Sequence, residues 1–155
     1  MQGIWVIGSE GYLGRALKTS LDSPHLRLWC SQHHSPHAPD YFNLAEPDLT
    51  PWQDILPQLD WVLICGGRPL LHDCQNHPTQ TERVNVAGPL ALAQALYRTG
   101  VVPVFFSSDY VFAGDQAPYS ETAPLRPLNA YGKQKAALEK GLQATLAADA
   151  YLLLR

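Results

Sequence analysis

Three glycines spaced three residues apart, between an apolar run and a helical pattern, constrain the fold of this chain more than any other feature. The apolar run covers residues 4–7, and the glycines are Gly8, Gly11 and Gly14. The first permits a tight turn, the second lets backbone N–H groups approach an anion at the helix N-terminus, and the third lets the helix pack closely on a sheet. This order predicts a strand-turn-helix unit that binds a dinucleotide pyrophosphate, with an ordinary connecting loop as the alternative.

Short apolar runs and helical patterns continue to alternate along the chain. Leu13, Leu17 and Leu21 recur every four residues, which places them on one helix face. Strands are predicted at residues 4–7, 26–30, 61–64, 101–106 and 151–154. These runs are continuously apolar, which is typical of a parallel sheet covered on both sides. The predicted fold is α/β: a Rossmann-type doubly wound parallel sheet with helices on both faces, in one domain spanning residues 1–155.

Local signals predict the ends of three helices. Thr50 and Gln53 are spaced as a capping box, which predicts a short helix. A long helix is predicted from about residue 81 to residue 99, with a kink at Pro89. Asn129 is placed to cap the last helix.

Composition and charge exclude several classes of protein. The chain is 46% hydrophobic and 16% charged, which indicates a folded globular protein. Its net charge is −3 without a basic cluster, which argues against a nucleic-acid partner. No apolar run approaches the roughly 20 residues of a membrane span, and the N-terminus leads directly into the first strand, so we expect no signal peptide. These features predict a cytoplasmic protein with no membrane partner.

The cysteines and histidines do not form a recognised disulfide or metal pattern. Cys30, Cys65 and Cys74 are odd in number and widely spaced, unlike a disulfide framework. Histidines gather within residues 33–37 and 72–77, in predicted loops without the spacing of a known metal site. We therefore expect reduced thiols, surface histidines and no bound metal.

Tyr131 and Lys135 are four residues apart on the last predicted helix and therefore share a face. An ammonium group near a phenol favours the phenolate, so Lys135 is expected to lower the pKa of Tyr131 from its ordinary value of about 10. Tyr131 would then exchange a proton near neutral pH. An exposed pair on a solvated face is the alternative.

Ser107 and Ser108 follow the fourth predicted strand. Ligands of open α/β sheets bind beyond the carboxyl ends of the strands. A serine hydroxyl there can hydrogen-bond a carbonyl oxygen of a substrate and stabilise developing negative charge. The alternative is a serine that caps a turn.

Taken together, these motifs resemble those of the extended short-chain dehydrogenase/reductases, closest to the dTDP-4-dehydrorhamnose reductase-like branch. The matching segments are residues 107–114, 118–121 and 127–135, with Glu139. The resemblance covers all 155 residues and corresponds to about the first half of a family member, so it implies that the C-terminal substrate portion is absent. It also implies that Ser108, Tyr131 and Lys135 are the catalytic residues: Ser108 polarises a keto group, Tyr131 protonates its oxygen, and Lys135 tunes Tyr131 and holds the ribose.

The resemblance and the glycine motif together predict a cofactor site. Its expected residues are Gly8, Glu10, Gly11, Tyr12, Leu13, Gly14, Arg15, Asn43, Leu44, Cys65, Gly66, Gly67, Asn85, Ser107, Tyr131 and Lys135. No acidic residue follows the second strand to bind a ribose 2′-hydroxyl, and Arg15 carries positive charge nearby. NADP is therefore the predicted cofactor, with NAD as the alternative. Asn85 has a second reading, in which it satisfies buried backbone groups at the Pro89 kink.

These observations predict an NAD(P)H-dependent reductase of a 4-keto nucleotide sugar. Two alternatives remain open: an epimerase or dehydratase of nucleotide sugars with the same fold, and a non-catalytic NADP-binding regulatory subunit. The long helix is Ala-rich and apolar on almost every side, which suits burial between subunits and predicts a homodimer.

Overall fold

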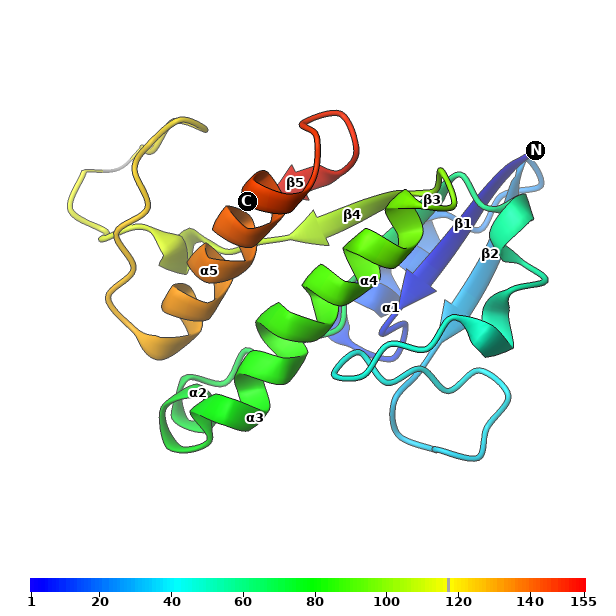
Figure 1. The fold of residues 1–155 in the computed structure, drawn as a ribbon, viewed down its shortest axis with the longest axis horizontal. Coiled ribbons are helices and arrows are strands. Elements are labelled where there is room, and N and C mark those ends of the chain that lie inside the picture. The colour runs from blue at the N-terminus through cyan, green and yellow to red at the C-terminus, as the bar shows by residue number, and fades with distance from the viewer. Residues whose placement is uncertain (117) are drawn as a thin grey trace.

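A computed structural model describes residues 1–116 and 118–155, and it contains one five-stranded parallel sheet (Figure 1). The strand order is β2-β1-β3-β4-β5, and every neighbouring pair is parallel. The strands are β1 (Gln2–Ile7), β2 (Leu26–Ser31), β3 (Trp61–Ile64), β4 (Val102–Phe106) and β5 (Leu152–Leu154). All five predicted strands are present within one residue of the expected bounds, except that β1 begins two residues early.

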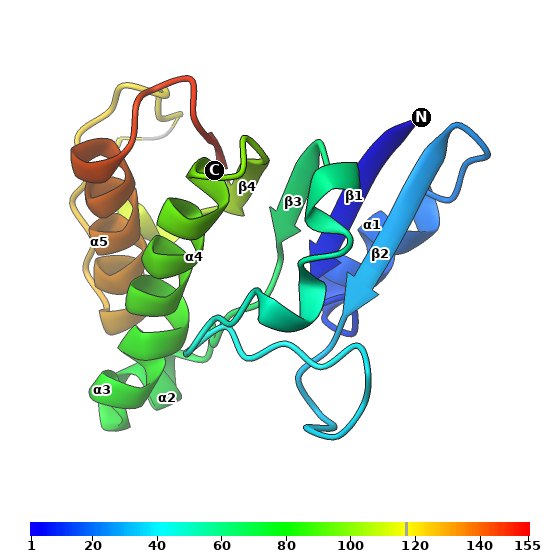
Figure 2. The same ribbon diagram turned by 45° about the vertical axis from the view of Figure 1, so that its right-hand side comes forward.

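Helices lie on both faces of the sheet, as expected for a Rossmann-type fold. The helices are α1 (Tyr12–Ser20), α2 (Leu71–Asn76), α3 (Pro78–Glu82), α4 (Gly88–Tyr97) and α5 (Ala130–Thr145). Figure 2 shows α4 and α5 side by side on one face and α1 on the other, behind β1 and β2. Because parallel strands point the same way, the carboxyl ends of β1 to β4 meet at one edge of the sheet, and this edge holds the candidate site.

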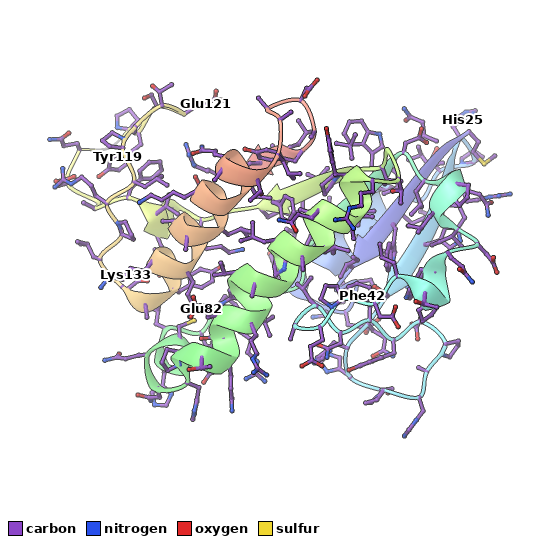
Figure 3. All side chains as sticks on the ribbon, in the orientation of Figure 1. His25, Phe42, Glu82, Tyr119, Glu121 and Lys133 are labelled. Atoms are coloured by element: carbon purple, nitrogen blue, oxygen red, sulfur yellow. The ribbon has the colours of Figure 1, made fainter. Side chains whose placement is uncertain are left out.

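The main core lies between the sheet and the α4–α5 face. Trp5 is fully buried and stacks on Trp52 with ring centroids 4.4 Å apart, while Phe42 meets the Trp5 ring edge-on at 5.0 Å. Leu92 and Leu142 bring α4 and α5 into the same cluster. Figure 3 shows Phe42 on the β1–β2 side of α4, whereas Tyr119 and Glu121 lie beyond α5.

The long helix predicted from residue 81 is present but irregular. It runs from α3 through a π-helical segment (Arg83–Ala87) into α4. Pro89 lies in the first turn of α4 and has no backbone N–H to donate to the regular helical ladder. The wider π turn just before it accommodates this proline. Gly88, the first residue of α4, packs directly against the backbone of Leu44, since a Cβ there would lie 2.8 Å from the Leu44 carbonyl carbon.

The capping box predicted at Thr50 is wrong. Residues Thr50–Trp52 form a single 3₁₀ turn, and the residue before it is Leu49. The Thr50 backbone N–H donates instead to the Asp48 carboxylate at 2.8 Å. The cap predicted at Asn129 is confirmed, because its side-chain oxygen accepts from the Gly132 N–H at 2.8 Å.

The outer strand β5 carries exposed apolar side chains. Leu152 and Leu154 of β5 are 46% and 49% exposed. Their neighbour Leu153 points the other way and packs against the main core. Among the described residues, no helix combines the length and apolar character that crossing a membrane would require.

Candidate functional site

The glycine turn between β1 and α1 is held against the end of β2. The backbone N–H groups of Gly8 and Ser9 both donate to the Ser31 carbonyl, at 3.1 and 3.0 Å. Gly8 has a φ of 80°, and a Cβ there would lie 2.7 Å from the backbone nitrogen of Gly66. Only glycine fits this position, because other residues rarely adopt such a φ and the neighbouring backbone leaves no room for a side chain.

A cleft of about 380 Å³ opens in front of this turn. Eight of the predicted cofactor residues line it: Gly8, Glu10, Gly11, Asn43, Leu44, Cys65, Gly66 and Gly67. The other residues of its wall were not predicted: Ile7, Gln32, His33, His34, Phe42, Ala45, Arg68 and Val84. The rule that ligands lie beyond strand ends points to His33 and His34 as well, because they lie in the turn just after β2.

Four predicted cofactor residues at the start of α1 lie outside this wall. Tyr12 is 92% exposed, Arg15 is exposed, and Leu13 is half-buried. Gly14 is buried, and a Cβ there would lie 2.8 Å from the Ser9 Cα, so its role is the close contact between α1 and the turn. Arg15 is not in the wall of the cleft, and the basic side chain there is Arg68.

Asn85 ties the loop after β3 to two helices. Its side chain is 1% exposed, accepts from the Arg68 N–H at 2.8 Å and donates to the Arg68 carbonyl at 2.9 Å. It also donates to the Gln134 side chain of α5 at 2.8 Å. The reading in which Asn85 satisfies backbone groups at the Pro89 kink is wrong, because the backbone that it satisfies belongs to Arg68. Asn85 thereby fixes the loop that carries Gly66 and Gly67.

Tyr131 and Lys135 gather with the serine pair at the carboxyl end of β4. The Lys135 ammonium donates to the Phe106 carbonyl at 2.8 Å and lies 5.8 Å from the centre of the Tyr131 ring. Tyr131 meets Tyr110 edge-on, with ring centroids 6.2 Å apart. Gly132 permits this approach, since a Cβ there would lie 2.9 Å from the Tyr110 carbonyl carbon. The motifs at residues 107–112 and 131–135 therefore form one cluster.

The two serines are engaged within the protein. The Ser108 hydroxyl donates to the Asp109 carboxylate at 3.0 Å and accepts from the Tyr110 N–H at 3.2 Å, which caps a 3₁₀ turn (Asp109–Val111). Ser107 donates to the buried carboxylate of Glu139. Ser108 thus performs the turn-capping role named above as the alternative, and a ligand would have to compete with these bonds for its hydroxyl.

The expected lowering of the Tyr131 pKa is wrong for this structure. Burial raises the pKa of Tyr131, and Cys74 and Asp109 add to the shift. Burial also lowers the pKa of Lys135 to about 8, although the Glu139 carboxylate opposes this. The Lys135 ammonium is bonded to a backbone carbonyl and not to the phenol. Burial therefore changes the pKa of Tyr131 more than the charge of Lys135 does. Tyr131 therefore holds its proton at neutral pH.

Replacing Lys135 with methionine should remove a pH-dependent component of stability. Burial lowers the pKa of Lys135 to about 8 in the folded protein, whereas a lysine in an unfolded chain titrates near 10.4. Between these values the unfolded chain binds more protons, so the wild-type free energy of unfolding rises with pH. Urea unfolding should show wild type gaining about 2 kcal/mol relative to Lys135→Met from about pH 8 to about pH 10.

Lys133 provides the matched control, because it lies on the same helix and is exposed. Lys133→Met should follow the wild-type pH profile. A stability difference between wild type and Lys135→Met that stays constant across this range would contradict the effect of burial on Lys135.

The histidine groups do not come together around a common centre. Among residues 1–116 and 118–155, no three His, Cys, Asp or Glu side chains are arranged to hold a metal ion. His33 instead stacks on Tyr41 with ring centroids 5.6 Å apart, and His72 lies beside Asn76 at 2.8 Å.

Comparisons with known proteins agree with this geometry. The family model described as the RmlD substrate binding domain matches residues 1–155. The dTDP-4-dehydrorhamnose reductase of Salmonella typhimurium is 30% identical over 141 residues, which are 90% of this chain and 46% of the reductase. The beta subunit of methionine adenosyltransferase 2 from Bos taurus is 28% identical over 151 residues, covering 92% of this chain and 45% of that protein.

Solved structures share the fold. RMD from Pseudomonas aeruginosa, complexed with NADPH, superposes with a TM-score of 0.75 at 26% identity, covering 99% of this chain and 52% of that one. The chain thus spans about half the length of the relatives that it matches.

Proposed function

Because the chain belongs to the RmlD substrate binding domain family, we propose that it is the cofactor-binding and proton-transferring half of an NADP(H)-dependent reductase of a 4-keto nucleotide sugar. The observation that carries this proposal is the cluster of Ser108, Tyr131 and Lys135 at the same edge of the sheet as the glycine cleft. Two relatives add support, since one is a dTDP-4-dehydrorhamnose reductase and one is complexed with NADPH.

The residues of the cleft fit a dinucleotide. The Gly8 and Gly14 positions leave no room for a Cβ, so at these two positions the turn at the N-terminus of α1 consists of backbone alone. Backbone N–H groups and the helix dipole favour a pyrophosphate there. Leu44 and Phe42 supply an apolar wall for the adenine, and Gly66 and Gly67 line the same cleft.

Tyr131 is suited to donate a proton. Burial raises its pKa, so the phenol remains protonated at neutral pH and can pass its proton to a developing alkoxide. Lys135 is positively charged at neutral pH and, once released from the Phe106 carbonyl, can bond ribose hydroxyls. The nicotinamide supplies the hydride when bound. Ser108 positions the keto oxygen after giving up its bond to Asp109.

A second candidate is a cofactor-binding subunit of another enzyme. One of the relatives is a subunit of methionine adenosyltransferase, and its identity to this chain is nearly that of the reductase. The engagement of the Ser108 hydroxyl in its own turn favours this alternative, because a turn cap needs no substrate. We retain the homodimer as part of either proposal.

Fluorescence titration with NADPH and NADH tests the proposal first. We expect NADPH to bind, and wild type, but not Tyr131→Phe, to oxidise NADPH when a dTDP-4-keto sugar is added. Binding by both proteins without any oxidation would favour the subunit reading. If neither nucleotide binds, the cleft is not a dinucleotide site and the proposal fails.

A further inference from the structure

The turn after β2 places two imidazoles at the mouth of the cleft. His33 and His34 are the second and third residues after Ser31, the last residue of β2. Both are exposed, and both line the cleft together with Glu10 and Gly11 of the glycine turn. The cofactor residues predicted from the sequence did not include them.

The backbone that carries these histidines is held in place by Gln32. Its side chain is buried, and its carbonyl oxygen accepts from the N–H groups of His34 and Ser35, at 2.6 and 3.0 Å. Its amide nitrogen donates to the Asp40 carboxylate at 3.2 Å. These hydrogen bonds fix the backbone of the turn that carries the two imidazoles. The His33 ring is also supported by the Tyr41 ring stacked against it.

The position of this turn determines which part of a nucleotide it meets. In dinucleotide-binding sheets, the residues after the second strand contact the 2′ position of the adenosine ribose. A carboxylate there binds a 2′-hydroxyl, and a cationic side chain accommodates a 2′-phosphate. Residues 31–35 contain no carboxylate and two imidazoles. An imidazole donates hydrogen bonds through its ring N–H and is positively charged when protonated.

We propose that His33 and His34 form the subsite for the 2′-phosphate of NADP(H), so that the preference for NADP(H) over NAD(H) increases as these imidazoles take up protons. The subsite rests on the proposed function, because it requires a dinucleotide in the cleft. It assigns cofactor selection to residues other than Arg15, which lies outside the cleft wall.

Other charged groups near the turn set the background for this preference. Glu10 and Arg68 line the same cleft, Asp40 is bonded to Gln32, and Lys18 lies close enough to Cys30 to influence its thiol. Carboxylate, ammonium and guanidinium groups in proteins ordinarily keep their charge between about pH 6 and pH 8. Imidazoles change charge in this range, and a phosphate monoester gains its second charge near pH 6. A preference that falls as the pH rises above 6 therefore reports the imidazoles, because the phosphate gains negative charge over the same range.

Two fragments of the cofactor isolate this subsite from the rest of the dinucleotide. Calorimetric titrations would compare adenosine 2′,5′-bisphosphate with 5′-AMP, near pH 6.5 and near pH 8.5. We expect the bisphosphate to bind roughly tenfold more tightly at the lower pH, as one charge-assisted hydrogen bond would give, and less than about threefold more tightly at the higher pH. The double variant His33→Gln/His34→Gln should lose this advantage at the lower pH and still bind 5′-AMP.

His37 provides the matched control, because it lies on the same loop, is exposed and does not line the cleft. His37→Gln should keep the wild-type preference at both pH values. If wild type binds both fragments with a preference that does not depend on pH, or if the double variant keeps the preference, the histidine subsite is overturned. If neither fragment binds to wild type, the proposed function itself fails, and the subsite fails with it.

Discussion

Gly14→Ala is expected to abolish tight NADPH binding and to destabilise the fold at the same time. A Cβ at this position would meet the Gly8 carbonyl oxygen and lie 2.8 Å from the Ser9 Cα. Both atoms belong to the backbone of the glycine turn, so no side-chain rotation relieves the clash. We expect urea unfolding to show a loss of about 2 kcal/mol, as is typical of overpacking. Displacing the turn should also remove the backbone N–H bonds that we propose for the pyrophosphate, so the dissociation constant of NADPH should rise at least about 100-fold.

Gly11→Ala separates these two effects. Its Cβ would meet only the Gly8 carbonyl oxygen, at 3.3 Å, and its φ of −72° suits alanine. Stability should therefore change by less than about 0.5 kcal/mol. NADPH binding should still weaken, because Gly11 lines the cleft and a methyl group would occupy space needed by the pyrophosphate. Wild-type NADPH affinity in both variants would show that this turn does not bind the cofactor.

The strands and the gathering of the motifs could be predicted because they depend on local patterns. Apolar runs bounded by glycines and prolines gave the strands, and parallel pairing then brought the ends of β1 to β4 to one edge. The cap at Asn129 is also local, since donor and acceptor are three residues apart. Such features need no knowledge of packing.

The contacts that were missed depend on packing between distant segments. Lys135 bonds the Phe106 carbonyl, 29 residues away, so its ammonium lies over the Tyr131 ring and forms no hydrogen bond with the phenol. The His33–His34 turn reaches the cleft because Gln32 bonds the loop from inside, which the adjacent residues do not reveal. The capping box at Thr50 failed because Asp48, two residues earlier, offers a competing carboxylate.

The largest loss of stability without any change in the cleft is expected from Arg155→Met. Glu139 is fully buried on α5, and the Arg155 guanidinium bonds its carboxylate at 2.6 Å and at 3.1 Å. Arg155 also donates to the Glu121 carbonyl, and Ser107 donates to Glu139. Removing the guanidinium leaves the buried carboxylate without the cation that is bonded to it, which typically costs about 3–5 kcal/mol. Chemical unfolding followed by circular dichroism measures this loss.

Arg126→Met is the matched control for this substitution. Arg126 pairs with Asp115 at a similar distance of 2.9 Å, but both side chains are largely exposed. An exposed ion pair contributes little to stability because solvent screens it, so the control should differ little from wild type. A loss as large as that of Arg155→Met would mean that burial is not the cause.

Combining Arg155→Met with Glu139→Gln tests whether the unpaired charge is the source of the loss. The double variant removes the buried charge along with its partner, and a neutral glutamine can still accept the Ser107 hydroxyl. It should therefore be more stable than Arg155→Met alone, although it carries one more substitution. The single variant Glu139→Gln completes the cycle, and the loss in the double variant minus the two single losses is the coupling energy, which for contacting residues has a magnitude of about 0.5–3 kcal/mol. Losses that simply add would show that Arg155 acts through its packing over the Phe112 ring, 5.6 Å away, rather than through its charge.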